Sequence, residues 1–162
     1  MADRVVAGIV VVSGGKILLV LSRKDEDSRA ARWSIPKGRH HEAADGGLFA
    51  TAARELLEET GLDLGGLDER QCASKGVLTY TRKGRNVELH YFVVERSEIL
   101  LDPLGTAGEA MSGVGLFTPA MALRFIRREQ RPLVEALRSR DAKGENARAL
   151  ARILRASRYE SN

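Results

Sequence analysis

The sequence is poor in cysteine, proline and aromatic residues, and it contains no long apolar run. Its one cysteine, Cys72, cannot form an internal disulfide, and a single thiol cannot supply a cysteine-based zinc site. No apolar stretch approaches the roughly 20 residues that a membrane-spanning helix needs. The Val-rich segment near the N-terminus is too short for a signal peptide and lacks a small-residue cleavage site. These absences predict a protein of the reducing cytoplasm that makes no membrane contact.

The sequence also lacks both common glycine-rich phosphate loops, Gly-x-Gly-x-x-Gly and the Walker type. With 162 residues and 43% apolar content, the chain is long enough for one domain with an appendage. We therefore expect a domain over residues 1–140 and a basic helical extension over 141–162. The charge distribution supports this division, because residues 119–162 hold 11 Lys/Arg against 5 Asp/Glu, whereas residues 1–118 hold 15 against 17.

Local patterns predict two antiparallel hairpins with a helix between them. Ser13-Gly14-Gly15 forms a tight turn between two Val-rich or Leu-rich runs, and the polar residues 82–85 form a second turn. The expected strands are 5–12, 16–21, 73–79, 87–95 and 115–117, with a short extended segment at 33–35. The expected helices are 48–60, 119–128, 131–138 and 147–157, and the expected loops are 25–32 and 100–113. This mixture predicts a layered α/β sandwich and not a repeating βαβ array.

The helix expected over residues 48–60 carries three glutamates opposite its apolar stripe: Glu55, Glu58 and Glu59. Glu55 and Glu59 are like charges at i,i+4, which costs a few tenths of a kcal/mol. Mg²⁺ prefers hard oxygen ligands and takes its remaining ligands from water and substrate phosphates. This face therefore predicts a divalent-metal site, and the alternative is a solvated helix face with an Arg54–Glu58 ion pair.

The segment from Gly38 to Leu62 resembles the Nudix box, G-x5-E-x7-R-E-U-x-E-E-x-G-U, in which U is aliphatic. Its second half matches at every specified position: Arg54, Glu55, Leu56, Glu58, Glu59, Gly61 and Leu62. The preceding Trp-Ser-Ile-Pro-Lys-Gly also looks like the entry to the box. The resemblance covers residues 5–138 and implies a Nudix-type α/β/α sandwich with a mixed sheet, followed by the C-terminal helical extension.

The first half of the box departs from this pattern. The pattern places fourteen steps between its first glycine and its arginine, but sixteen steps separate Gly38 from Arg54. The position at which the pattern expects a glutamate is Gly46. Either Glu42 or Asp45 takes that acid's place on a longer loop, or the role is absent. Because the glutamates of the helix are intact, we expect activity to survive.

The resemblance implies a role for each matching residue. The Gly38 carbonyl, Glu55, Glu58 and Glu59 would hold Mg²⁺ or Mn²⁺, and Arg54 would orient a glutamate. Hydrolysis then follows from attack of a metal-activated water on one phosphorus of a diphosphate. Glu58 or Glu59 would accept the proton of that water. Members of the family also recruit an acid from a distant loop, for which the candidates are Glu88, Asp102 and Glu109.

Three features outside the box favour a substrate with more than two phosphates. The spacing of Tyr80 from the box resembles that of a tyrosine in dinucleoside polyphosphate hydrolases, although an ordinary strand aromatic explains it equally well. The Trp-Ser-Ile-Pro-Lys-Gly segment looks like the diadenosine tetraphosphate and diphosphoinositol polyphosphate branches. Cations flank the expected cleft: Arg23, Lys24, Arg32, Lys37, Arg39, Arg82, Lys83 and Arg85. The predicted substrate is a dinucleoside polyphosphate or a diphosphoinositol polyphosphate, and the predicted contacts are Arg23, Lys37, Arg39 and Tyr80.

Two other functions stay open. Residues 93–96 and 108–116 resemble segments of MutT-like enzymes that hydrolyse oxidised nucleoside triphosphates, so a nucleotide-pool sanitising enzyme is the alternative. The basic tail allows an RNA-binding or RNA-processing Nudix protein, although nucleic acid is not the favoured partner. We expect His40, His41 and His90 to be loop or strand residues and not catalytic groups. The expected partner is a small phosphorylated substrate, and the chain is expected to be a monomer or a homodimer.

Overall fold

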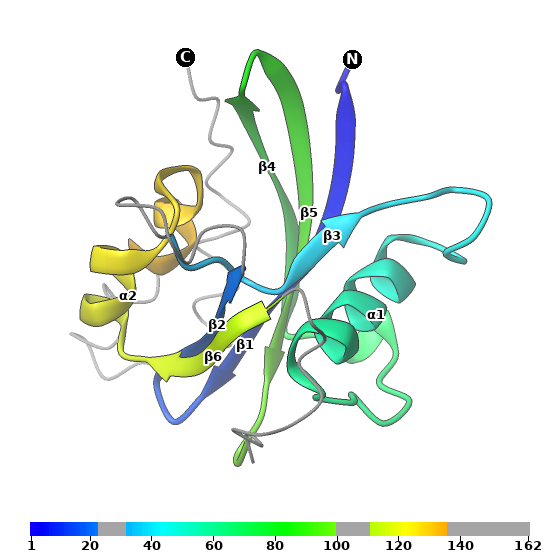
Figure 1. The fold of residues 1–162 in the computed structure, drawn as a ribbon. Helices are drawn as coiled ribbons and strands as arrows, with labels where there is room; N and C mark the ends of the chain where they lie inside the picture. Colours follow the sequence, from blue (N-terminus) through cyan, green and yellow to red (C-terminus); the bar gives the residue numbers. More distant parts are fainter. Residues whose placement is uncertain (23–31, 100–110, 136–162) are drawn as a thin grey trace.

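The computed structural model describes residues 1–22, 32–99 and 111–135. Its strands are β1 (Arg4–Ser13), β2 (Lys16–Ser22), β3 (Lys37–Arg39), β4 (Ser74–Arg82), β5 (Arg85–Glu95) and β6 (Met111–Phe117). Its helices are α1 (Leu48–Thr60), α2 (Pro119–Phe125) and the short 3-10 turns η2 (Glu69–Gln71) and η3 (Arg128–Gln130), and residues 131–135 are also helical. Figure 1 shows these elements along the chain.

The strands form one mixed sheet in the order β4-β5-β1-β2-β6. Strand β1 runs parallel to β5, and the other pairings are antiparallel. The first half of β1 also pairs with β3, whereas its last residues pair with β2 across the hairpin turn. A single central strand therefore links the hairpin, the parallel pair and the short β3.

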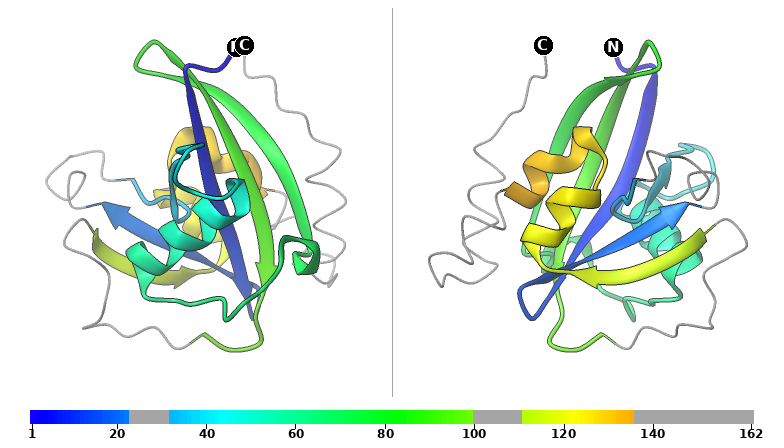
Figure 2. Two further views of the ribbon diagram at one scale, coloured as in Figure 1. Left: turned by 90° about the vertical axis from the view of Figure 1, so that its right-hand side faces the viewer. Right: turned by 60° about the vertical axis from the view of Figure 1, so that its left-hand side comes forward.

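Helices cover both faces of this sheet, with α1 on one side and α2 on the other (Figures 1 and 2). Side chains of β1 alternate between these two layers, as successive residues of a strand must. Ala7, Ile9 and Val11 pack in the cluster that includes α1, whereas Val6 and Val10 pack in the cluster that includes α2. The predicted α/β/α sandwich with a mixed sheet is thus confirmed.

The two predicted hairpins and the predicted α1 are confirmed. The first turn uses Gly14 and Gly15, with φ values of 55° and 75°, and the second uses Lys83 and Gly84, with φ values of 51° and 73°. The bounds of α1 agree with the prediction. The strands of the second hairpin extend further toward the turn than predicted, because the polar residues Thr81, Arg82 and Arg85 to Asn86 also pair across it.

Two predicted boundaries are wrong. Strand β6 begins at Met111, not at residue 115, because the glycine-containing segment pairs with β2 and Gly113 leaves room for the Trp33 ring. A Cβ atom on Gly113 would lie 2.8 Å from Cη2 of Trp33. Helix α2 ends at Phe125, not near residue 128, because Ile126 turns into the core and forms a parallel bridge with Trp33.

Several predicted features lie outside the described residues: most of the loop 25–32, residues 100–110 of the loop 100–113, the end of the helix 131–138, and the helix 147–157 in the extension 141–162. Among the helices that the structure does describe, none combines the length and the apolarity needed to cross a membrane.

The α2 layer is joined to the segment before β3 by one fully buried polar side chain, Gln130. The backbone N–H of Ile35 donates to Gln130 Oε1 at 2.9 Å, and Gln130 Nε2 donates to Ser34 Oγ at 3.1 Å. These bonds satisfy groups that are buried away from water. The 3-10 turn η3 is therefore tied to the chain that enters the site.

Replacing Gln130 with Met should lower the free energy of unfolding by about 1–3 kcal/mol, because the Ile35 N–H loses its acceptor while it stays buried. Urea denaturation monitored by circular dichroism measures the change. The matched control is Glu135→Met, which places the same side chain at an exposed position of the neighbouring turn and should shift stability by no more than about 0.5 kcal/mol. Equal effects of the two changes would contradict this account.

Candidate active site

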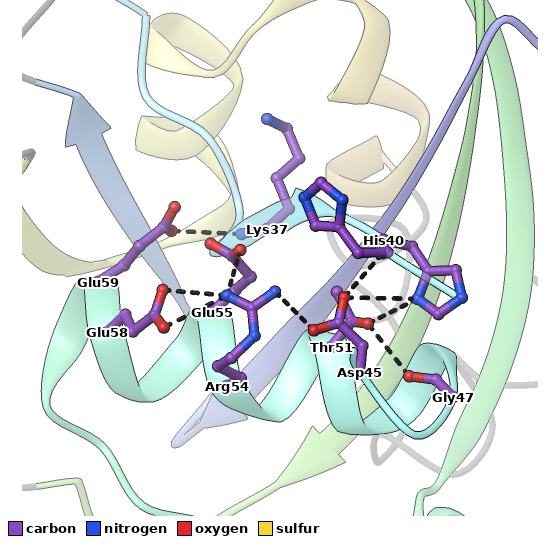
Figure 3. Close-up of polar contacts among 10 residues, drawn as sticks. Lys37, His40, Asp45, Gly47, Thr51, Arg54, Glu55, Glu58 and Glu59 are labelled. Atoms are coloured by element: carbon purple, nitrogen blue, oxygen red, sulfur yellow. Dashed lines mark hydrogen bonds and ion pairs between the residues drawn. The ribbon is translucent and has the colours of Figure 1, made fainter. Parts of the chain in front are cut away.

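Helix α1 displays its charged face because its apolar face is buried against the sheet. Ala52 and Leu56 are fully buried. The helix ends at Gly61, whose φ of 73° is left-handed and whose N–H donates to the Leu57 carbonyl at 2.8 Å, as a helix C-cap requires. The opposite face carries four charged residues: Arg54, Glu55, Glu58 and Glu59 (Figure 3).

Strand β3 brings Gly38 against α1. Gly38 pairs with Ala7 of β1, on the face of the sheet that α1 covers. A Cβ atom on Gly38 would lie 2.0 Å from the carboxyl carbon of Glu55, so a glycine is required where this carboxylate meets the backbone. The adjacent Lys37 donates its backbone N–H to Glu59 Oε2 at 3.2 Å. Two of the three glutamates are thus held against β3.

Arg54 lies among three carboxylates (Figure 3). Its Nη1 donates to Glu55 Oε1 at 2.9 Å and to Glu58 Oε2 at 3.2 Å, and its Nη2 lies 3.3 Å from Asp45 Oδ1. The Arg54–Glu58 pair is the i,i+4 ion pair named above for the alternative of a solvated helix face. Arg54 therefore positions Glu55 and Glu58 and partly offsets their charge.

The negative charge of this face is only partly compensated. Burial raises the pKa of the Glu59 carboxyl to about 8, and the nearby Glu55 and Glu58 act in the same direction, while Lys37 opposes them. Burial also raises the pKa of Glu55, against the influence of Arg54. Burial is the main cause of both pKa shifts, and repulsion among the carboxylates adds to it. A cation bound between the ionised carboxylates would offset that repulsion.

The loop between β3 and α1 places Asp45, and not Glu42, beside the box arginine. Asp45 accepts a hydrogen bond from the His41 N–H at 2.8 Å and pairs with Arg54, and its side chain is 6% exposed. The His41 N–H is the main cause of a lowered Asp45 pKa. Glu42 is exposed, and it makes no ion pair with any residue of the described part of the chain. The sequence alone could not choose between these acids, because the longer loop has no fixed register against α1.

The residues present suit a hard divalent cation in their chemistry. Within residues 1–22, 32–99 and 111–135, no three carboxylate, imidazole or thiolate side chains converge as a ready-made metal site. Each glutamate instead faces a protein group: Glu55 meets Gly38 and Arg54, Glu58 meets Arg54, and Glu59 meets the Lys37 N–H. Carboxylate oxygens are nevertheless the ligands that Mg²⁺ and Mn²⁺ take, and burial, with repulsion from neighbouring glutamates, raises the pKa of Glu55 and of Glu59.

The structure places other predicted site residues as follows. Arg39 is exposed on β3, whereas Tyr80 is 8% exposed within the core cluster that includes α2. Arg23, Lys24, Asp102 and Glu109 lie outside the described residues. Glu88 is paired with His90, and His40 contacts Thr51 Oγ1 at 2.7 Å through its Nδ1.

A second group of charges lies on the face of the sheet that α2 covers. Lys37 pairs with Gly8, and a Cβ atom on Gly8 would lie 2.8 Å from the Lys37 Cβ, so the Lys37 side chain lies on this face. Tyr80 and Arg82 alternate onto the same face of β4. Burial, followed by repulsion from Arg127 and Arg82, lowers the pKa of Lys37 to about 8. Sequence reasoning missed Arg127, because nothing in the linear pattern connects it with β3.

Comparison with known families and proteins gives a consistent assignment. A family model described as the NUDIX domain matches residues 2–137. Protein 111R of Invertebrate iridescent virus 3 is 48% identical over 58 residues, which are 36% of this chain and 30% of the viral protein. The match thus spans less than a third of that relative.

Several solved structures share the fold. A Caenorhabditis elegans Ap4A hydrolase binary complex matches with a TM-score of 0.65 and 19% identity over 88% of this chain and 99% of that chain. The NUDIX domain of Shewanella oneidensis NrtR, solved with ADP-ribose, matches with a TM-score of 0.65 and 18% identity over 86% and 89%. The MutT NUDIX hydrolase of Burkholderia pseudomallei matches with a TM-score of 0.60 and 18% identity over 82% and 95%. At these identities, the likeness shows the fold alone.

The metal-free protein should lose stability as pH rises from about 4.5 to about 8. The folded pKa of Glu59 is about 8, whereas its ordinary value is 4.5, so in this window the folded state binds more protons than the unfolded state, and the free energy of unfolding falls with pH. Glu59→Gln should flatten this slope. Denaturation in EDTA across the window tests it, with the exposed Glu95→Gln as the control that leaves the slope unchanged. If Glu59→Gln kept the wild-type dependence of stability on pH, another titrating group would be responsible for that dependence.

Asp45→Asn should destabilise the protein at neutral pH more than Glu42→Gln does, because only Asp45 accepts the His41 N–H and pairs with Arg54. The pKa of Asp45 is lowered in the folded state, so its contribution is present above its ordinary pKa and is lost as pH falls through the folded value. Thermal unfolding at neutral and acidic pH measures both effects. A larger loss of stability for Glu42→Gln would show that Glu42, and not Asp45, takes the place of the glutamate that the first half of the box lacks.

Proposed function

The chain belongs to the Nudix family of pyrophosphohydrolases, and from this premise we propose that it hydrolyses a phosphoanhydride bond in a substrate with more than two phosphates. The best candidates are dinucleoside polyphosphates and diphosphoinositol polyphosphates. The supporting observation is that β3 joins a carboxylate face to a cationic face through two adjacent residues, Gly38 and Lys37. A metal-bridged diphosphate and further phosphates could therefore lie side by side.

The carboxylate face would carry the chemistry. The Gly38 carbonyl, Glu55, Glu58 and Glu59 are the proposed ligands of Mg²⁺ or Mn²⁺. A bound ion supplies neutralisation of the diphosphate charge and a water of lowered pKa. Arg54 holds Glu55 and Glu58 in place through its Nη1.

The proton of the attacking water needs a carboxylate acceptor, which we assign to Glu58 or Glu59. Glu58 is the more exposed of the two, and Arg54 is its one ion-pair partner among the residues that the structure describes. Glu59 is more buried and accepts the Lys37 N–H. The two candidates therefore differ in access to solvent and in attachment to β3.

The cationic face supports the choice of a phosphate-rich substrate. Lys37, Arg82 and Arg127 are each half-buried, and Arg127 and Arg82 are close enough to lower the pKa of Lys37. The carboxylates of Glu59 and Glu129 partly oppose this repulsion, and phosphate groups beside the three cations would reduce it further. We propose that phosphates beyond the hydrolysed bond meet these three cations, with Tyr80 as part of the wall beneath them.

The setting of the enzyme is also a proposal. We expect it to act in the cytoplasm on a small soluble substrate, as a monomer or a homodimer. Cys72 is a free, half-buried thiol. Burial raises the pKa of that thiol to about 11, so it stays protonated and takes no part in the chemistry. The extension 141–162, on which an RNA-binding role would depend, lies outside the described residues.

Purified protein with Mg²⁺ or Mn²⁺ should release phosphate or a nucleotide from diadenosine polyphosphates or diphosphoinositol polyphosphates. Glu55→Gln and Glu59→Gln should each lower kcat/KM by about a hundredfold or more, because both are proposed ligands. Glu95→Gln is the matched control and should leave kcat/KM unchanged. Absence of turnover on a panel that also contains ADP-ribose, capped RNA and nucleoside triphosphates would sink the proposal, and turnover of nucleoside triphosphates alone would indicate the MutT-like alternative.

Arg82→Gln should change KM by an amount that depends on how many phosphates the substrate carries. For substrates with more than two phosphates, KM should rise about tenfold, equivalent to about 1.4 kcal/mol, while hydrolysis of the two-phosphate ADP-ribose changes little. Arg85→Gln removes the same charge on the other side of the hairpin turn, at an exposed position, and serves as the control. An equal rise in KM for both classes of substrate would show that Arg82 does not contact the additional phosphates.

A further inference from the structure

An open hollow of about 580 Å³ lies beside α2, apart from the site described above. Its size falls within the range of small-molecule sites, roughly 300–1,000 Å³. The residues around it are Arg32, Ala120, Leu123, Arg124, Ile126, Arg128 and Arg131. None of them belongs to α1, β3 or β4. The hollow is therefore distinct from the carboxylate face and from the cations Lys37, Arg82 and Arg127.

Four of these seven residues are arginines, which we call the arginine pocket: Arg32, Arg124, Arg128 and Arg131. No carboxylate lines the hollow, because its remaining walls are apolar side chains. Within residues 1–22, 32–99 and 111–135, none of the four has an Asp or Glu oxygen within the 4.0 Å of an ion pair. No described carboxylate thus forms an ion pair with them.

Hydrogen bonds join the backbone segments that carry these arginines. The N–H of Trp33, the residue after Arg32, donates to the Phe125 carbonyl at 2.8 Å, and the Arg127 N–H donates to the Trp33 carbonyl at 2.8 Å. Gln130 ties η3 to the same segment through Ile35. Segments that are far apart in the sequence therefore meet here, and Figure 2 shows α2 and the following turns on one side of the sheet.

The Arg124 guanidinium lies 5.9 Å from the centroid of the Phe125 ring, which restricts its position through a cation–π contact. All four arginines are exposed. Guanidinium groups bind phosphate oxygens through paired N–H donors, and several of them around one concave surface match an anion with several phosphate groups. A single carboxylate ligand would leave most of this charge unpaired.

We propose that the arginine pocket is a binding site for a small anion that carries two or more phosphate groups, separate from the carboxylate face and independent of a divalent ion. The shape favours this ligand over nucleic acid, because an extended backbone follows a groove or stripe of charge, whereas these arginines surround one hollow. The site would bind such an anion by charge-assisted hydrogen bonds and would carry out no chemistry on it.

Isothermal titration calorimetry of the full chain with inorganic tripolyphosphate, in EDTA and at low salt, tests the proposal. EDTA removes any divalent ion, so binding through the proposed metal site is suppressed, and Arg82→Gln reports any binding at the cations Lys37, Arg82 and Arg127. Wild-type protein should bind tripolyphosphate, and Arg128→Gln with Arg131→Gln should weaken binding about tenfold or more, whereas Arg82→Gln should weaken it less. The control pair Lys16→Gln with Arg85→Gln makes the same change in net charge at exposed hairpin positions and should bind like wild type.

Three results would overturn the proposal: no binding to wild-type protein, equal weakening in the control pair, or tight binding of a single-stranded RNA without binding of tripolyphosphate. Thermal unfolding should show that both double variants are folded, as expected for substitutions of exposed side chains. Arg128→Lys with Arg131→Lys should restore part of the affinity, because charge returns without the paired donors. The measurement contains no hydrolysis step, so its outcome is independent of the proposed enzymatic activity.

Discussion

The pairing of β3 with β1 determines where the charged groups of the site lie. Only three residues long, β3 sits on a central strand whose side chains alternate between two helical layers. Gly38 therefore faces α1 and meets the Glu55 carboxylate, while Lys37 faces the α2 layer. A slip of one residue in this register would exchange the two faces. One short ladder thus separates the carboxylates from the cations while keeping them adjacent.

The same arrangement leaves the folded state with unfavourable electrostatics. Asp45 and the three glutamates of α1 lie close together. Arg54 pairs with Asp45, Glu55 and Glu58, the Lys37 N–H donates to Glu59, and the His41 N–H donates to Asp45. Burial, with a further contribution from repulsion among these carboxylates, raises the pKa of Glu55 and of Glu59. Stability and the proposed function therefore make opposite demands on this helix, since clustered carboxylates weaken the metal-free fold but would suit a divalent ion.

The α2 layer has two roles that use different sides of it. Its inner side is apolar and buries Ala122 and Ile126 against the sheet, with Gln130 satisfying the buried backbone of the chain that leads to β3. Its outer side carries the arginine pocket. Because the inner contacts hold the backbone, the exposed arginines can be arranged around the hollow without contributing to the core.

The sequence by itself determined the features that depend on neighbours in the chain. The helix 48–60, its glycine cap and the two hairpins follow from local periodicity and turn chemistry, and the matching residues from Arg54 to Leu62 indicated the family that the comparison confirmed. Other features were decided only by the tertiary structure. It places Asp45, and not Glu42, beside Arg54, and it buries Tyr80 in the core. It also extends β6 through its glycines and brings Arg127 toward Lys37. Each of these depends on contacts between segments far apart in sequence, and such contacts exist only once the sheet has paired and both helical layers have packed on it.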